Sequence, residues 1–200
     1  MSDRDVDLLF EVGSLRHVPR NWRQFGGLNF ANVAEHSFRV AWVAILIAVE
    51  EGADPARTAL LALFHDAPES RLGDRNYVQR VHTSQNVSQA VAGLLDGTAV
   101  ESLGHELWME WTEVATLEAA SAHDADIVDC DLELREQSDS GAALPGMLEA
   151  TRAAARSALR TATARRLWDA IQGRSSHSWH LSARNRLNAG DWAAQESDTT

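Results

Sequence analysis

The sequence predicts an all-α fold, a compact bundle of helices. Apolar residues recur at helical spacing along most of the 200 residues, and no stretch sustains the alternation typical of a β-strand. The hydrophobic fraction of 44% is ordinary for a globular protein and argues against wholesale disorder. A chain of this length suits one domain with a sizeable core. We expect that domain over residues 1–173, followed by a polar tail over residues 174–200.

The N-terminal half is expected to hold three helices. Segment 6–15 is amphipathic, and segment 33–49 is apolar on most sides, which is typical of a central buried helix. A third helix begins at Asp54-Pro55, because Asp caps helices and Pro suits the first helical turn, and it ends near His65-Asp66. Prolines and glycines indicate two long loops, over residues 17–32 and 68–77.

The C-terminal half continues the helical pattern. Residues 138–143 form a breaker stretch, and Gly173 is expected to cap the last helix. Leu159 and Ala162 are among the residues spaced for one face of a single long Ala/Arg-rich helix. The helices expected here span residues 84–95, 101–111, 113–137 and 145–172.

The charge balance restricts the classes of partner. The chain has 18 basic and 29 acidic residues, for a net charge of −11, and every basic residue is arginine. Such a surface disfavours polymeric nucleic acid, whose binding needs many basic phosphate contacts, while one or two arginines can still hold a small anion. The single cysteine, Cys130, excludes an intrachain disulfide and fits a reducing compartment. An acidic N-terminus without a signal pattern and apolar runs too short for a membrane span lead us to expect a cytoplasmic protein.

Four side chains on three expected helices can close around one divalent metal ion. His65 and Asp66 follow six apolar residues at the end of a helix, His36 opens another apolar helix, and Asp126 lies in a third. Taken alone, a His-Asp pair is more often a capping or surface pair than part of a metal site. Because the chain lacks cysteine pairs, zinc-finger sites are excluded. Imidazole and carboxylate ligands suit Mn, Fe, Co, Ni or Zn, and Mg where waters complete the coordination sphere.

These segments resemble the HD-domain metal-dependent phosphohydrolases, in particular the compact 5′-deoxynucleotidase type. The resemblance spans about residues 8–138 and is carried by the sequence segments AEHS around His36, LFHDAPE around His65-Asp66, Gly73-Asp74 and Ala125-Asp126. It implies an HD-type domain over residues 1–173, with His36, His65, Asp66 and Asp126 as metal ligands. Asp129 stays open as an alternative to Asp126, because it lies on nearly the same helix face. The family usually has a basic residue three before this aspartate, and His123 occupies that position.

The resemblance also assigns two acidic residues to the chemistry. Hydrolysis of a phosphate ester needs an activated water, and a divalent metal lowers the pKa of a bound water from 15.7 toward about 7. Glu69 lies three residues past Asp66 and can orient that water or protonate the leaving oxygen, although residue type alone fits a solvated glutamate equally well. Asp74 follows Gly73, so it is either a turn residue or, as the resemblance implies, the carboxylate that faces the sugar.

The loop around residues 16–23 is the candidate for substrate binding. Arg20 and Arg23 offer bidentate recognition of phosphate, and Trp22 offers either an aromatic face for a base or a buried anchor for the loop. In the deoxynucleotidases an arginine precedes the matching tryptophan, whereas this chain has Asn21. Their Ile-Pro after the Gly-Asp pair is likewise replaced, here by Arg75-Asn76.

We therefore expect a metal-dependent enzyme that converts deoxynucleoside monophosphates to deoxynucleosides and phosphate. A deoxynucleoside triphosphate triphosphohydrolase is the alternative, since Arg184 and Arg186 of the tail could reach further phosphates. A non-catalytic metal-binding interaction module is a third hypothesis, but such a module has no need of Glu69. Cyclic-nucleotide or alarmone hydrolysis ranks below these, because such enzymes tend to be larger or to carry other motifs. A homodimer or higher homo-oligomer is expected.

Overall fold

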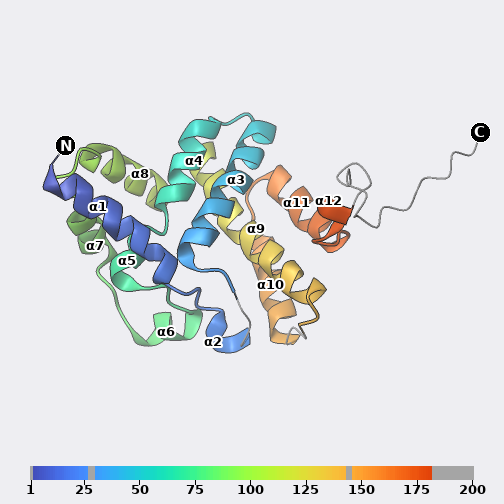
Figure 1. Ribbon diagram of the computed structural model, residues 1–200. Coiled ribbons are helices and arrows are strands. Elements are labelled where there is room, and N and C mark those ends of the chain that lie inside the picture. Colours follow the sequence, from blue (N-terminus) through green and yellow to red (C-terminus); the bar gives the residue numbers. More distant parts are fainter. Residues whose placement is uncertain (1, 27–29, 143–145, 182–200) are drawn as a thin grey trace, which may run out of the picture.

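Two long helices, α3 (Val33–Glu51) and α9 (Leu117–Asp139), form the centre of the structure together with α4 (Pro55–Phe64) (Figure 1). This computed structural model describes residues 2–26, 30–142 and 146–181. Within these ranges the β-type pairing is limited to one isolated bridge between Pro19 and Asn32. The predicted all-α class is therefore confirmed.

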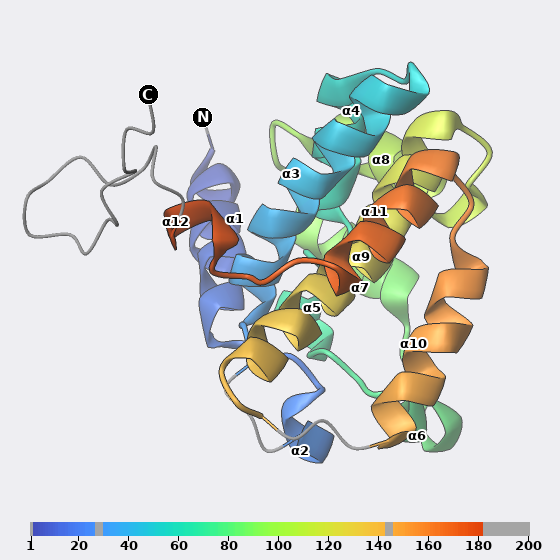
Figure 2. The same cartoon turned by 90° about the vertical axis from the view of Figure 1, so that its right-hand side faces the viewer.

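The core lies where these three helices meet α11 (Ala162–Gln172), which packs on α9 and α3 (Figure 2). Small residues at the crossings let the helix axes approach closely: Ala44 of α3, Ala62 of α4 and Ala122 of α9 have no exposed surface. Larger side chains then fill the space between the layers, and those fully or nearly fully buried include Val40, Ile47, Leu61, Val128, Leu159 and Trp168.

Shorter elements surround this centre. Helices α2, α6 and the start of α10 gather at one end of the bundle (Figures 1 and 2). The bounds of the remaining elements are α1 Asp3–Gly13, η1 Ser14–His17 (a 3-10 helix), α2 Arg23–Gly26, α5 Glu69–Leu72, α6 Tyr77–His82, α7 Val87–Leu95, α8 Glu101–Glu113, α10 Gly146–Ala158 and α12 Ser178–Leu181.

Two of the predicted helix starts are built as the sequence indicates. Asp54 caps α4, since its Oδ1 accepts a hydrogen bond from the Ala56 backbone N–H at 2.8 Å, and Pro55 is the first helical residue. Asn32 caps α3 and forms a capping box with Glu35, whose carboxylate accepts from the Asn32 backbone N–H. This cap fixes the first turn of α3, on which His36 lies.

Short helices occupy both regions predicted to be loops. The segment 17–32 contains α2, the segment 68–77 contains α5, and α6 was not predicted at all. Each is only four to six residues long, so apolar periodicity gives little signal. The visible signal for α6 is its cap, because Asn76 and Gln79 form a capping box.

The single long helix predicted over residues 145–172 is wrong. The chain leaves the helical path after Ala158, and Thr161 caps a new helix by accepting from the Ala164 backbone N–H. Asp124 of α9 stabilises the break between the two helices. Its buried carboxylate accepts hydrogen bonds from the backbone N–H groups of Arg160 and Thr161 and from the Thr161 hydroxyl. Ala162 consequently lies on the exposed surface.

The other predicted bounds shift by a few residues. The helix expected from residue 113 begins at Leu117, because Val114 ends α8 in a left-handed conformation (φ 48°). Gly173 follows α11 as predicted but has φ −86°, so its position does not depend on the conformational freedom of glycine. None of the helices in the described residues is both long enough and apolar enough to cross a membrane.

We expect Asp124→Ala to lower the free energy of unfolding by about 3 kcal/mol, because it leaves buried donors at the α10–α11 break without an acceptor. Asp124→Asn, which keeps one oxygen acceptor, should lose less. Urea unfolding in the presence of a chelator measures both, and the matched control is Asp169→Ala, an exposed carboxylate paired with Arg156 on the same hairpin. Equal stability of Asp124→Ala and the control would contradict this role.

Candidate metal centre

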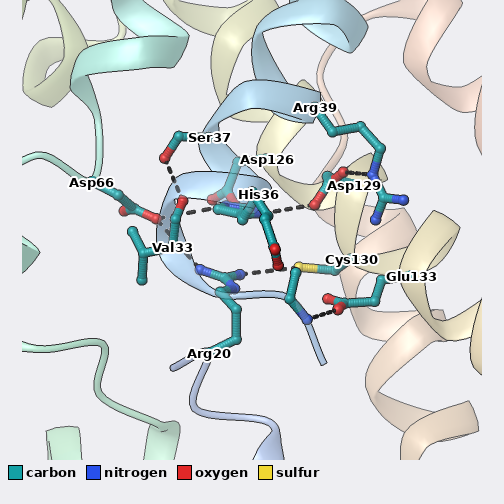
Figure 3. Close-up of polar contacts among 12 residues, drawn as sticks. Arg20, Val33, His36, Ser37, Arg39, Asp66, Asp126, Asp129, Cys130 and Glu133 are labelled. Carbon is teal, nitrogen blue, oxygen red and sulfur yellow. Dashed lines mark hydrogen bonds and ion pairs between the residues drawn. The ribbon is translucent and has the colours of Figure 1, made fainter. Parts of the chain in front are cut away.

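The first ligand candidate, His36, is held in place by a carboxylate on α9. Its Nδ1 lies 2.7 Å from Asp129 Oδ2, and the imidazole is fully buried (Figure 3). The opposite ring atom, Nε2, lies 3.1 Å from Asp126 Oδ1 and 3.5 Å from Asp66 Oδ2. Since Nδ1 donates to Asp129, the neutral ring presents the lone pair of Nε2 toward these two carboxylates.

His65 repeats this arrangement from another helix. It is the C-cap of α4, and its Nδ1 donates to the Ala62 carbonyl at 2.6 Å. Its Nε2 therefore also points its lone pair inward, 3.1 Å from Asp66 Oδ2 and 3.9 Å from Asp126 Oδ1. Helix α4 ends here, so that Asp66, the next residue, can turn its carboxylate to the same side as His65.

The donor set fits a divalent cation. Neither Nε2 atom makes a well-formed hydrogen bond with any residue that the structure describes, although both atoms are buried. Ligand atoms of His36, His65 and Asp126 all lie within 4.8 Å of one another, and Asp66 Oδ2 contacts both imidazoles. Two imidazoles and two carboxylates suit Mn, Fe, Co, Ni or Zn, and they leave room for water or substrate in the coordination sphere.

The electrostatics of the cluster agree with this role. Burial alone lowers the pKa of His65, but the Asp66 carboxylate outweighs it and raises that pKa to about 9. Burial raises the pKa of Asp126, but the close contact with His36 and the positive charge of His65 outweigh this and hold the pKa well below the usual range. The cluster thus attracts positive charge, and a divalent cation on these atoms would displace the proton of His65, because a ligating imidazole must be neutral.

The structure distinguishes the two aspartates that the sequence leaves open. Asp126 faces the Nε2 atoms, whereas Asp129 is fully buried behind His36 and binds Arg39 through its other oxygen. Arg39 also pairs with Glu136, two turns further along α9. Sequence reasoning missed Arg39, although its place three residues after His36 on the same helix was a usable signal.

A cavity of about 310 Å³ opens beside the cluster, and Glu69 lies in its wall with Asp66 and Asp126. The Glu69 Oε2 atom is buried and has no hydrogen-bond partner among the described residues. Burial, followed by the charges of Asp66 and Asp74, raises the pKa of Glu69 to about 9. The structure thus rules out the solvated-surface interpretation of Glu69 and leaves a carboxyl group that can hold a proton near neutral pH.

Arg20 is the cation of the cavity wall. Its Nη1 lies 3.4 Å from both Asp66 Oδ2 and Asp74 Oδ2, and its Nη2 contacts Cys130 Sγ at 3.5 Å. Burial raises the pKa of Cys130 to about 12, so this residue is a neutral thiol and not a nucleophile. The predicted substrate residue Arg20 therefore lies between the ligand candidates and Asp74.

Asp74 is more buried than the sequence suggested. Its Oδ2 accepts from the Asn21 backbone N–H at 3.0 Å, and its Oδ1 accepts from the Asn21 side chain at 2.5 Å. The carboxylate therefore anchors the loop that carries Arg20 and Trp22, and it also contributes to the cavity wall. Asn21, which replaces the arginine expected by resemblance, is the residue that makes this anchor.

The outer wall of the cavity comes partly from the C-terminal third, where no sequence motif indicated a role in the site. Arg152 of α10 pairs with the buried Asp131 of α9 and lies over the ring of Trp168 at 6.0 Å. Trp22 lines the same cavity and packs against Phe30 and Leu134. The other outer residues are Arg75, Asn76, Tyr77, Arg80 and Thr151.

One predicted binding residue among those that the structure describes is not brought to this cavity. Arg23 borders a separate hollow with Arg16 and His17, so the structure does not place it beside Arg20. Arg184 and Arg186 lie outside the described residues. His123, expected near the last ligand, stacks on Trp111 at 3.6 Å and hydrogen-bonds the Trp111 carbonyl, which places it behind His65.

Comparisons with known proteins agree with this geometry. The family described as HD domain matches residues 12–168, and no curated protein matches. A conserved hypothetical protein from Pyrococcus furiosus is 28% identical, with a TM-score of 0.61 over 68% of this chain and 84% of that chain. A protein from Pyrococcus horikoshii OT3 shares the fold, with 22% identity and a TM-score of 0.67 over 84% of this chain and 96% of that chain.

We expect Asp129→Asn to weaken binding of Mn²⁺ or Co²⁺ by about 10–100-fold, because the carboxylate that orients His36 loses its charge. Isothermal titration calorimetry on folded protein measures the affinity. The matched control is Glu136→Gln, which changes the exposed partner of Arg39 and should leave affinity nearly unchanged. Unaltered affinity in Asp129→Asn, or an equal loss in the control, would contradict this positioning role.

Proposed function

Because this chain belongs to the HD-domain family and is a metal-dependent phosphoric ester hydrolase, we propose that it is a 5′-deoxynucleotidase, which releases phosphate from deoxynucleoside monophosphates. The observation that carries the proposal is the convergence of the candidate cation site, Glu69 and Arg20 on one cavity. Two aromatic side chains that also line this cavity, Trp22 and Trp168, suit a nucleobase.

In this proposal, His36, His65, Asp66 and Asp126 hold the divalent cation. When bound, the cation neutralises phosphoryl oxygens and lowers the pKa of water. Arg20 adds a buried guanidinium beside the same position and can donate to the phosphoryl group, as arginine does in bidentate phosphate recognition. These groups together offset the negative charge of a phosphate monoester in a chain whose net charge is −11.

Glu69 acts in the proposal as the general acid. Its raised pKa keeps a proton on the carboxyl group, and its free oxygen lies in the cavity wall. A water oxygen bonds to phosphorus while the bond between phosphorus and the ester oxygen breaks, which leaves the phosphoryl group as orthophosphate. Glu69 donates its proton to the departing ester oxygen, so that the nucleoside leaves as a neutral alcohol, and the spare proton of the water restores the protonated Glu69.

Nucleotide selection in this proposal depends on the loop anchored by Asp74. Asp74 holds Asn21, and Asn21 in turn holds the neighbouring Trp22 against the cavity. The 3′-hydroxyl of the sugar would approach Asp74, whose carboxylate can accept its hydrogen bond, and a 2′-substituent would crowd the same place. The acidic surface disfavours polymeric nucleic acid and leaves small nucleotides as substrates.

One observation favours a triphosphohydrolase as the second candidate. Arg75, Arg80 and Arg152 line the outer part of the cavity in addition to Arg20 at its base. Several arginines along one cavity suit a chain of phosphates better than a single phosphate. The two activities differ in their product, because one releases orthophosphate and the other releases inorganic triphosphate.

We expect orthophosphate release from deoxynucleoside monophosphates in the presence of Mn²⁺ or Co²⁺, with ribonucleotides slower. The purified chain is incubated with deoxy- and ribonucleoside mono- and triphosphates, and products are separated by ion-exchange chromatography. Triphosphate as the product would replace this proposal with the second candidate. Hydrolysis of a general phosphate monoester without turnover of any nucleotide would reject both nucleotide assignments.

We expect Glu69→Gln to lower kcat by at least about 100-fold, because the amide cannot donate the proton, while affinity for Mn²⁺ stays within about threefold. The matched control is Glu11→Gln, which changes a carboxylate that binds Ser70 and Arg71 of the same short helix from outside the cavity. Steady-state kinetics and calorimetry give the two quantities. A Glu69→Gln protein with wild-type kcat would exclude the general-acid role.

A further inference from the structure

Arg152 of α10 is fixed in the cavity wall by a buried carboxylate. Its Nε donates to Oδ1 of Asp131, whose side chain has no exposed surface. Gln172 donates to the other oxygen of the same carboxylate at 2.6 Å. The ring of Trp168 lies 6.0 Å from the guanidinium carbon. The guanidinium is therefore held along one edge by Asp131 and on one face by an aromatic ring.

This arrangement leaves the outer edge of the guanidinium for a ligand. No described residue accepts a hydrogen bond from the Nη groups of Arg152, and the side chain is 23% exposed where it lines the cavity. A buried carboxylate is costly unless it is paired, so Asp131 and Arg152 stay together and the Nη edge keeps one orientation. Two N–H donors at a fixed spacing match a ligand that has two adjacent acceptors.

The position of Arg152 separates it from the candidate cation site. Asp126 and Asp131 are five residues apart on α9, which places them about 7.5 Å apart along the helix axis and about 140° apart around it. Ile127 and Leu134 line the cavity over the same turns. A ligand that joins the cation site to Arg152 therefore spans more than the single bridging oxygen between neighbouring phosphates. A sugar ring between a phosphate and a base provides such a span.

We propose that Arg152 reads the base of the nucleotide and selects guanine. This inference rests on the proposed function and adds a base preference to it. Guanine presents two adjacent acceptors, O6 and N7, and an arginine that donates to both is the commonest specific contact with this base. Adenine carries an amino group in place of O6, so its hydrogen atoms would face those of the guanidinium. Pyrimidines lack N7 and offer no such pair of acceptors.

Arg152 differs in its anchoring from the other arginines of the outer wall. Arg75 donates through Nη1 to the carbonyl and the hydroxyl of Thr83, so part of its outer edge is already occupied. Arg80 is exposed on α6. These two residues can contact additional phosphates whether or not Arg152 contacts a base, so the two roles can be tested separately.

The first test compares nucleotides that differ at O6 and N7. The purified chain with Mn²⁺ is given dGMP, dIMP, dAMP and dCMP, and dIMP is included because it keeps O6 and N7 without the 2-amino group of guanine. We expect kcat/KM for dGMP and for dIMP to exceed that for dAMP by about tenfold. Equal values for dGMP and dAMP would overturn the proposal, and this comparison needs no variant.

Arg152→Lys isolates the contribution of the guanidinium edge. Lysine keeps a positive charge beside Asp131, but its ammonium lacks the pair of parallel donors. We expect the preference for dGMP over dAMP to fall to within about twofold, while affinity for inorganic triphosphate stays within about threefold of wild type. The matched control is Arg156→Lys, one turn further along α10 in an exposed pair with Asp169, which should keep the preference.

Calorimetric titration of dGMP and dAMP into the Glu69→Gln protein with Mn²⁺ measures the preference without turnover. Tighter binding of dGMP, with no nucleotide hydrolysed by wild type, would reject the proposed function and support this inference. Hydrolysis with a preference that Arg152→Lys leaves unchanged, or that Arg156→Lys removes equally, would reject this inference and leave the proposed function standing. Loss of triphosphate affinity together with the preference in Arg152→Lys would assign the arginine to phosphates and would overturn the inference as well.

Discussion

The structure depends on neutralising a dense group of charges in a small, largely buried space. His36, His65, Asp66 and Asp126 converge from three helices, and Arg20 and Glu69 border the same volume. Burying such groups is costly unless each has a partner. Hydrogen bonds from the outside reduce that cost: Asp129 and the Ala62 carbonyl fix the rings, and Asn21 fixes Asp74. The inward-facing atoms can thus be left for a cation and a substrate.

Helix α9 serves both the core and this centre. Its alanines at 122 and 125 pack against the neighbouring helices without exposed surface. Asp126 and Asp129, which lie between such core positions in the sequence, point toward His36. The same turns of α9 supply both the packing alanines and the aspartates that face His36. A shift of the helix would therefore disturb the core packing and the position of the carboxylates together, and the close alanine contacts hold the helix in register.

The sequence predicted the parts of the fold that have a strong local cause. The central helix and the helix begun by Asp54-Pro55 follow from apolar runs and caps, and the grouping of His36, His65, Asp66 and Asp126 follows from their placement at helix ends and from resemblance. The break between α10 and α11 was missed, because it depends on Asp124, more than 30 residues away in the chain.

The site predictions divide in the same way. The candidate ligands predicted on regular helices lie together in the structure. The residues predicted on the segment 16–23 do not all reach the cavity: Arg20 and Trp22 line it, and Arg23 does not. A loop has no period from which side-chain direction can be read. Arg152 and Trp168 had no local signal, since only the folded hairpin carries them to the cavity wall.

The break held by Asp124 has an evolutionary consequence. It ties the turn between α10 and α11 to α9 through the buried carboxylate of Asp124, two residues before Asp126. A second buried carboxylate of α9, Asp131, bonds Arg152 and Gln172 of the same hairpin. The other cavity-facing residues of the hairpin can therefore change independently of the ligands, provided that the contacts to Asp124 and Asp131 are kept. Related proteins can therefore keep one hydrolytic centre while the hairpin residues that line the cavity change. A few substitutions there, far in the sequence from the metal-ligand candidates, are enough to alter substrate specificity.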